Sequence, residues 1–196
     1  MPTEPLQRVL ELIDRLNRED PNTDLVGGAA RPRELVYAER LSAWVQRLNP
    51  HASEALQIAA RGQHIQRWTI PRSRYPMTRQ GYLRWRETLK TFHAQTVGTL
   101  MRQAGYTEGD IARVQLIISK RRLTDDADTQ TLEDALCLVF LETQFTDLKH
   151  KTSDDKMREL IRKTWAKMSE RGRSAAMQLP LGNEERTFLA DALSGV

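Results

Sequence analysis

Two of the four histidines, His64 and His93, stand where they could bind a metal or transfer a proton. His64 follows Gln63 at the end of an apolar helical stretch, and His93 begins an amphipathic segment. Glu133 and Asp134 enter the apolar run ALCLVFL. A buried carboxylate is costly unless it is paired, hydrogen-bonded or bound to a metal. Imidazole and carboxylate groups are common metal ligands and general bases, so these residues indicate a candidate site.

Each of these residues also has an ordinary structural interpretation. A histidine can be a packed, hydrogen-bonded core residue, and two acids at the start of a helix are favoured by its dipole. The single cysteine, Cys137, lies among apolar neighbours, so we expect a buried structural thiol rather than a nucleophile.

Arginines and aromatic residues alternate just after His64, in RWTIPRSRYPM and GYLRWR. Guanidinium groups and aromatic faces suit phosphate or carboxylate recognition and base stacking. Alternatively, the aromatics anchor a long loop and the arginine stems cover them. Arg84 and Arg86 cannot both face one side of a helix. The candidate ligand contacts are Arg67, Trp68, Arg72, Tyr75 and Arg86.

Composition is that of an ordinary soluble protein of one domain. The chain has 196 residues, of which 39% are hydrophobic and 29% charged, and a net charge of +4. One cysteine excludes a disulfide framework and favours a reducing cytoplasm. The N-terminal stretch is not a signal peptide, and no apolar run approaches the roughly 20 residues of a membrane span.

Hydrophobic periodicity predicts helices throughout and no strand. Thr107 and Ser169 are expected to be helix N-caps. Residues 124–130 read as an acidic loop, and 20–32 as a loop broken by glycine and proline. The expected helices cover 4–19, 32–48, 53–65, 78–103, 107–123, 131–148, a stretch from 153, 171–178 and 184–193.

An ordered series of motifs resembles the HD-domain phosphohydrolase superfamily. In AARGQHIQR, Gln63 and His64 fall on the His-Asp pair that names the superfamily. The stretch YAERL matches the first-helix pattern, with Tyr37 at its histidine. His93 falls on the histidine that opens the next helix, and Asp134 on the last aspartate ligand.

This resemblance implies an HD-like helical fold over residues 32–148. It also implies one divalent metal (Mn, Fe, Zn or Ni) held by His64, His93 and Asp134, with water completing the shell. A second metal is not expected, because Gln63 is a poor ligand and Lys120 would repel a cation. The alternative is a site without metal, in which Lys120 and the histidines bind an anion together with Arg67.

At finer scale the chain is similar to the family called domain of unknown function 4202. The similar stretches include PRELVYAERLSAW, QHIQRWTIPRSRYPM, QTLEDALCLVFLE and RKTWAKMSERG, and they cover nearly the whole chain. We expect an HD-like domain over 1–152, with the helices of 153–196 packed on it as a C-terminal extension.

The predicted function is that of an enzyme, or a degenerate one, that acts on or binds a phosphorylated or nucleotide-like small molecule. Glu133 and Lys120 are the candidate catalytic residues, with Glu133 as general base or as the partner of a metal ligand. Two alternatives stay open: a non-catalytic RNA- or anion-binding module that uses the Arg/Trp loop, and a structural adaptor with a vestigial site.

Overall fold

Helices make up nearly all of the regular structure in a computed structural model that describes residues 3–121 and 125–194. The predicted all-α class is therefore confirmed. The elements follow the order α1 (Glu4–Asn17), β1 (Thr23–Val26), β2 (Ala29–Pro32), α2 (Arg33–Leu48), α3 (Glu54–Gly62), η1 (Arg67–Thr69), η2 (Arg72–Arg74), α4 (Arg79–Gln103), α5 (Glu108–Ser119), α6 (Ala127–Thr143), α7 (Phe145–Lys151), α8 (Asp154–Lys167), α9 (Glu170–Met177) and α10 (Asn183–Leu193).

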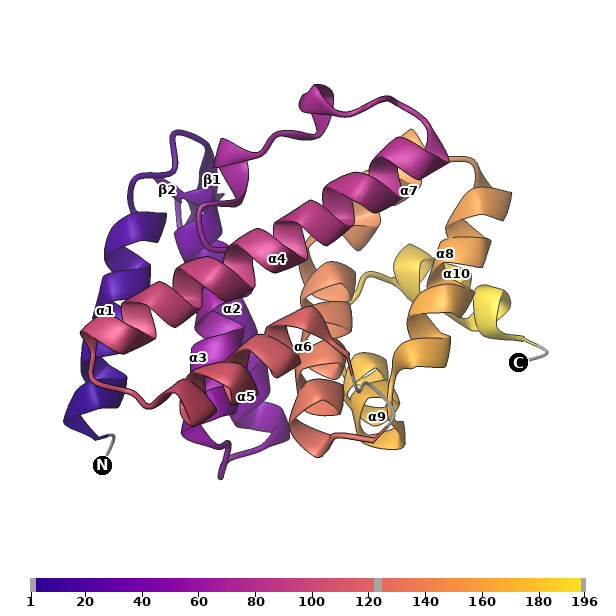
Figure 1. Cartoon of the computed structure of the whole chain (residues 1–196). Coiled ribbons are helices and arrows are strands. Elements are labelled where there is room, and N and C mark those ends of the chain that lie inside the picture. Colours follow the sequence, from indigo (N-terminus) through magenta and orange to yellow (C-terminus); the bar gives the residue numbers. More distant parts are fainter. Residues whose placement is uncertain (1–2, 122–124, 195–196) are drawn as a thin grey trace.

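Helix α6 is the central element of the bundle. It packs against α2, α3 and α5 on one side and against α7, α8 and α9 on the other. Its apolar side chains are buried along most of its length, as its apolar sequence predicts. Figure 1 shows α1 and the C-terminal helices at opposite sides of the molecule, with α6 between them.

Helix caps follow the sequence signals in two places and depart from them in a third. Thr107 and Ser169 cap α5 and α9 through their side-chain oxygens, as predicted. Asp126 caps α6, so this helix begins before the expected position 131. Glu133 and Asp134 therefore lie well inside α6, and a helix-start position does not explain them. Helix α5 ends at Ser119 with Lys120 as its C-cap, so its expected continuation was wrong at 120–121, and 122–123 lie outside the described residues.

The segment expected to be a loop between α1 and α2 contains a small antiparallel hairpin. Thr23 pairs with Pro32 and Val26 with Ala29. Gly27 and Gly28 form its turn with φ values of 57° and 84°, which glycine adopts without strain. The prediction of no strand was therefore wrong here, although the hairpin is short.

The C-terminal helices share side chains with the main core. Met168, Ala176 and Leu179 belong to the large apolar cluster of the bundle. A smaller cluster forms around Phe145, Ile161 and other apolar residues of α8 and α10. Within the described residues, no helix is long and apolar enough to cross a membrane.

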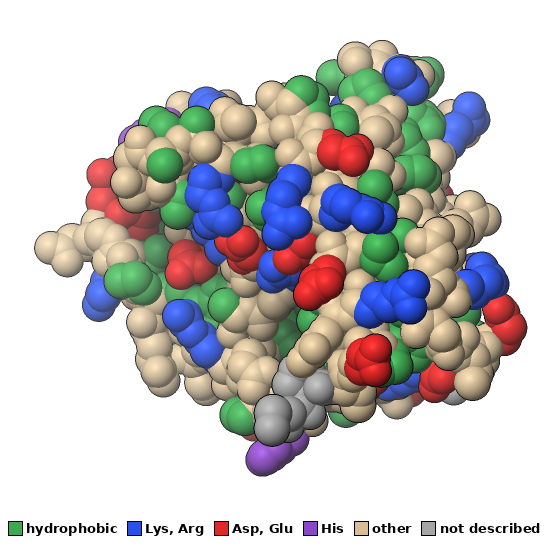
Figure 2. All heavy atoms as spheres, turned by 90° about the vertical axis from the view of Figure 1, so that its left-hand side faces the viewer, with side chains coloured by type: hydrophobic (Ala, Val, Ile, Leu, Met, Phe, Trp, Pro, Cys, Tyr) green, Lys and Arg blue, Asp and Glu red, His purple; other side chains and the backbone are tan. Residues whose placement is uncertain are grey.

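Charged side chains of both signs alternate on the face that carries α1. Figure 2 shows lysine and arginine interspersed with aspartate and glutamate there, without a continuous basic area. Part of this mixture is paired: Arg61 of α3 donates two hydrogen bonds of 2.6 Å to the Asp14 carboxylate of α1. A mixed surface of this kind is typical of solvated faces.

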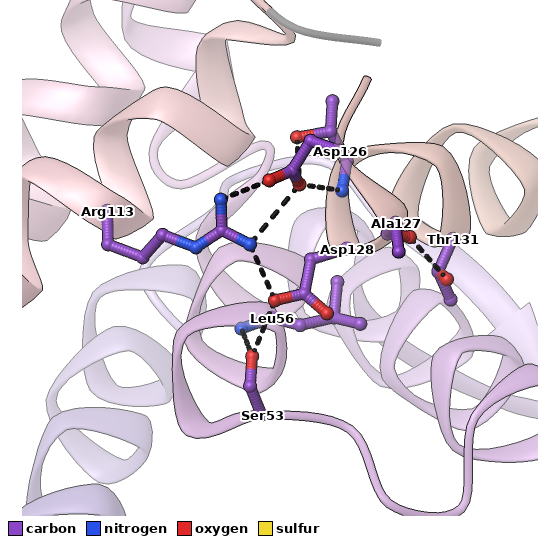
Figure 3. A network of polar contacts seen from close by, with 8 residues as sticks. Ser53, Leu56, Arg113, Asp126, Ala127, Asp128 and Thr131 are labelled. Carbon is purple, nitrogen blue, oxygen red and sulfur yellow. Dashed lines mark hydrogen bonds and ion pairs between the residues drawn. The ribbon is translucent and has the colours of Figure 1, made fainter. Parts of the chain in front are cut away.

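A polar network fixes the start of α6 against α3 and α5 (Figure 3). Arg113 of α5 forms ion pairs with Asp126 and Asp128. Asp128 in turn accepts a 2.8 Å hydrogen bond from Ser53, the N-cap of α3. Because α6 carries Glu133, this network also fixes the position of Glu133 along the axis of α6 relative to α3 and α5.

Candidate functional site

A cavity of about 270 Å³ lies between α2, α4, α6 and α8 and reaches the turn after α3 and the end of α5. Five basic side chains and a single carboxylate are among its lining. Six of the predicted site residues meet there: His64, Arg67, Arg86, His93, Lys120 and Glu133. The rest of its lining is Tyr37, Gln63, Leu89, Lys90, Leu136, Cys137, Phe140, Gln144, Thr164 and Lys167.

Close packing of α3 on α4 brings the two histidines to one wall. A Cβ at Gly62 would lie 2.3 Å from Cγ2 of Val97, so only glycine permits this approach. The turn after Gly62, which carries His64, then runs beside His93. The ring centroids of His64 and His93 lie 6.0 Å apart. Gln66 ends the turn with φ of 49°, held by a hydrogen bond from its N–H to Asn17. A non-glycine residue in this region is strained, and such strain is found preferentially at functional sites.

His64 is held in a fixed orientation by its neighbours. Its ring stacks on Tyr37 with centroids 4.1 Å apart and planes 11° apart. Its Nδ1 lies 3.4 Å from Oε2 of Glu34. Burial lowers the pKa of His64 well below its ordinary value, helped by the positive charges of Arg67, Lys120 and Arg86. His64 is therefore neutral at physiological pH, with one nitrogen able to accept a proton.

Glu34 is a site residue that the sequence did not reveal. It lies in the first turn of α2, where an acid has an ordinary explanation, and its partner His64 is thirty positions away. Burial raises its pKa to about 7, against the opposing charge of Arg67. No pattern in the sequence joins the two residues; only the packing of α2 against the turn after α3 does.

His93 is neutral and its tautomer is fixed. Its Nδ1 lies 2.9 Å from the Ile65 carbonyl oxygen, which can only accept, so Nδ1 carries the proton. Burial is the largest cause that lowers the pKa of His93 to about 3. The remaining nitrogen, Nε2, is buried and has no hydrogen-bond partner among the described residues.

Lys120 and Glu133, the predicted catalytic pair, form a buried ion pair. Lys120 Nζ lies 2.6 Å from Oε2 of Glu133, and Lys167 Nζ lies 3.8 Å from Oε1. Burial alone would raise the pKa of Glu133, but the charges of Lys120, Lys167 and Arg86 outweigh it and hold the pKa below its ordinary value. Burial lowers the pKa of Lys120, although Glu133 opposes the shift. Lys120 ends α5 with φ of 54°, the second strained backbone position at the site.

Arg67 and Arg86 reach the cavity over aromatic rings. The guanidinium carbon of Arg67 lies 4.7 Å from the ring centroid of Trp85, and that of Arg86 lies 6.0 Å from Tyr82. Burial lowers the pKa of Arg67, but a guanidinium stays charged. Stacking restricts both side chains and orients their N–H groups before a ligand arrives.

The other predicted ligand contacts lie outside the cavity. Arg72 donates to the backbone oxygens of Tyr75 and Pro76 at 2.9 and 2.7 Å, so it closes the loop on itself. Trp68 and Tyr75 are half-buried in that loop and do not line the cavity. Trp85 anchors the loop by donating to the Ile70 carbonyl at 2.9 Å. The anchoring interpretation therefore describes this part of the loop.

Asp134 does not join the histidines. Its carboxylate accepts hydrogen bonds from Ser169 N at 2.8 Å, from the Ser169 hydroxyl and from Gln130 at 3.0 Å. It lies so close to α9 that a Cβ at Gly172 would be 2.6 Å from its Cγ. Asp134 thus fixes the N-terminal end of α9 to α6 and does not line the cavity.

The residues present do not fit the single-metal site that the HD resemblance implies. Among the described residues, no group of three His, Cys, Asp or Glu side chains is placed to hold a metal ion. Tyr37 and Gln63 stand where that superfamily has ligands, and Lys120 brings positive charge to the same cavity. Cys137 offers no thiolate either, because burial raises its pKa to about 12.

A second cavity, of about 430 Å³, adjoins the first. It shares Tyr37, His64, Arg67 and Gln144 with the first cavity and adds Glu34 to their surroundings. The Tyr37–His64 stack thus stands at the junction of the two spaces. A group bound in either space can contact the His64 ring.

Comparison with protein families gives one match, to the family described as Domain of unknown function (DUF4202), over residues 7–189. Neither the curated proteins nor the solved structures include a match to the chain. The matched span includes every residue that lines the cavity, from Tyr37 to Lys167.

Proposed function

The chain belongs to the DUF4202 family, and from the geometry of its cavity we propose that it binds a phosphorylated or nucleotide-like small molecule there, without a metal. One observation carries the proposal. Five cations line the cavity against one carboxylate, and that carboxylate is already paired with Lys120. Such a wall attracts anions and gives them charge-assisted hydrogen bonds.

Desolvation of the cations supports an anionic ligand. Lys120 is only 17% exposed, and burial lowers the pKa of both Lys120 and Arg67. Buried positive charge is unfavourable without enough negative charge nearby. A phosphate group would supply that charge and fit the planar guanidinium groups of Arg67 and Arg86.

The resemblance to HD-domain phosphohydrolases supports the same ligand class. Tyr37, Gln63, His64 and His93, which fall on motif positions of that superfamily, all line this cavity. An HD-like ancestry in which the cations replaced the metal would keep the cavity and its phosphate ligand. Glu133 and Lys120 would then set the electrostatic potential of the site, and they would not activate a metal-bound water.

Cavity size favours a small molecule over RNA. The volume of about 270 Å³ is near the lower end for small-molecule sites, which start at roughly 300 Å³. Arg72 donates to backbone oxygens of its own loop, and Arg74, although exposed, donates to the Thr69 carbonyl of that loop. The α1 face mixes both signs of charge (Figure 2).

One geometric feature favours catalysis as a second candidate function. A neutral His64, 3.4 Å from Glu34 and stacked on Tyr37, has the arrangement of a general base oriented by a carboxylate. In this role Glu34 is a positioning residue, and His64 would accept a proton from water or from a ligand hydroxyl.

Two arginines on α4 provide a matched test of the binding proposal. Arg86 lines the cavity, whereas Arg84 is exposed and outside it. In calorimetric titrations with inorganic phosphate and adenosine monophosphate, Arg86→Ala should weaken binding by about 10- to 100-fold. Arg84→Ala should leave binding unchanged. Equal effects of the two changes, or loss of binding after chelation of metals, would contradict the proposal.

RNA is the comparison ligand in the same experiment. A single-stranded oligonucleotide should bind weakly, and its binding should not depend on Arg86. If RNA binds tightly with a steep salt dependence and responds to Arg84→Ala, the RNA-binding alternative is the correct one.

A further inference from the structure

Among the described residues, three buried acceptor atoms in the cavity wall form no hydrogen bond, and one of them, Oε2 of Glu133, is ion-paired with Lys120 at 2.6 Å. Nε2 of His93 and Oε1 of Gln63 are both unpaired among the described residues. Their residues line the cavity and are only 2% and 6% exposed. Native proteins rarely leave buried polar atoms unpaired, and each exception calls for an explanation.

The hydrogen bond made by Nδ1 of His93 determines the protonation state of Nε2. Nδ1 donates to the Ile65 carbonyl 2.9 Å away, so Nε2 carries a lone pair and no proton. The lowered pKa of His93 keeps it in this neutral form. In a site without a metal ion, Nε2 can therefore be satisfied only by a hydrogen-bond donor.

Gln63 adds a second acceptor next to the first. It caps the C-terminal end of α3, and close packing at Gly62 holds this end against α4, which carries His93. The cations of the cavity do not satisfy either atom. Lys120 pairs with Glu133. The guanidinium groups of Arg67 and Arg86 lie over aromatic rings.

We propose that the ligand of this cavity presents hydroxyl or amino groups to Gln63 and His93 while the basic side chains hold its phosphate. The inference rests on the proposed function and narrows it. The substrate class is a phosphorylated polyol, sugar or nucleotide. Inorganic phosphate and alkyl phosphates carry no hydroxyl or amino group apart from the phosphate that the basic side chains hold. A site built to receive a hydrogen-bond donor discriminates strongly against an analogue without one, because its buried acceptors are then left unpaired.

The test compares ligands that share the phosphate and differ in their hydroxyl groups. Wild-type protein is titrated calorimetrically with inorganic phosphate, methyl phosphate and ribose 5-phosphate. Ribose 5-phosphate should bind at least about tenfold more tightly than methyl phosphate. Equal affinities would overturn the inference while leaving phosphate binding, and so the proposed function, intact. Absence of binding for all three would overturn both.

Two variants locate the effect. Gln63→Met and His93→Phe each remove an acceptor and keep the approximate shape of the side chain. Each should abolish most of the ribose 5-phosphate advantage, measured as the ratio of its affinity to that of methyl phosphate, so that any effect on phosphate binding itself cancels. A preference for ribose 5-phosphate that survives in both variants would show that other residues receive the hydroxyl groups, and would overturn the assignment.

Stability of the free protein gives a readout that does not depend on a ligand. Replacing an unpaired buried acceptor by an apolar group of similar shape should not destabilise the fold. The unfolding temperature of Gln63→Met should therefore equal or exceed that of the wild type. A clear decrease would mean that Gln63 is already satisfied in the free protein, most simply by water, and would count against the inference.

Discussion

Nδ1 of His64 lies 3.4 Å from Oε2 of Glu34, across the interface between α2 and the turn that follows α3. Glu34 is buried and His64 is largely covered, and this burial shifts their pKa values in opposite directions. It raises the pKa of the carboxyl and lowers that of the imidazole. The two shifts reverse the ordinary order of the pKa values, so that a proton shared by the pair lies on Glu34 rather than on His64.

Glu34→Gln should stabilise the protein in a pH-dependent way. The folded-state pKa of Glu34 is about 7, above its ordinary 4.5, so its ionisation costs the folded state more than the unfolded state. The penalty is absent below pH 4.5, grows as pH rises, and is complete above pH 7. The variant should match the wild type at pH 4.5 and exceed it by roughly 1–3 kcal/mol at pH 8, measured by denaturant unfolding.

Glu19→Gln is the control for that measurement, since Glu19 is exposed and loses the same charge. A stability gain of equal size for both variants at pH 8 would refute a specific cost at Glu34.

Asp126→Asn should weaken the network that fixes the start of α6. Burial raises the pKa of Asp126, but hydrogen bonds from Arg113 and Thr129 outweigh it and lower the pKa to about 2. The carboxylate therefore stabilises the fold above pH 3.8, and this stabilisation is lost as pH falls towards 2. Asparagine keeps the cap, so we expect a loss of roughly 1–2 kcal/mol at pH 7 that disappears near pH 2.

Acid titrations of the wild type and Asp126→Asn, followed by circular dichroism, check this expectation. Asp191→Asn, at an exposed position of α10, serves as control. A wild-type advantage that persists unchanged at pH 2 would exclude the Arg113–Asp126 pair as its source.

Asp134→Ala separates a structural role from a metal-binding one. Its carboxylate holds Ser169 and Gln130, so the substitution should cost roughly 2–4 kcal/mol of stability through the docking of α9. Ser169→Ala should show a smaller loss in the same direction.

Elemental analysis of untagged protein should give the same metal content for the wild type and the His64→Ala, Asp134→Ala double variant. A stoichiometric metal that is lost in that variant would support the HD-like metal centre.

Cys137 should resist alkylation while the protein is folded. Its thiol is only 6% exposed, and burial raises its pKa to about 12. At pH 8 the thiolate fraction should be lower than that of an ordinary cysteine by about three orders of magnitude. Iodoacetamide labelling followed by mass spectrometry should therefore be slow in native buffer and fast in denaturant. Rapid native labelling would mean that the cavity opens far enough to ionise the thiol.

Apolar periodicity and capping residues predict most of the fold. Thr107 and Ser169 illustrate this, because a cap acts within its own turn and can be recognised in a short stretch of sequence. The hairpin at 23–32 escaped prediction because its strands have four residues each and are only partly covered. Their conformation depends on packing against α2 rather than on local pattern.

The site was predictable in its residue types and less so in its partners. Spacing along α4 separates Arg86 from Arg84, and the turn after α3 brings Arg67 to His64, so these cations could be identified from sequence. The role of Asp134 could not, because it depends on the docking of α9, whose N-cap Ser169 lies thirty-five residues later. Glu34 likewise becomes a site residue only through the packing of α2.

Thr164 and Lys167 extend the cavity wall into α8, near the end of the chain. Helix α8 therefore closes the space that α2, α4 and α6 leave open, so the cavity exists only while α8 is packed on the bundle. Under the proposed function, a ligand of this cavity would bind only the form of the protein in which α8 is packed. By mass action it would also hold α8, and through it the C-terminal helices, in place against proteolysis.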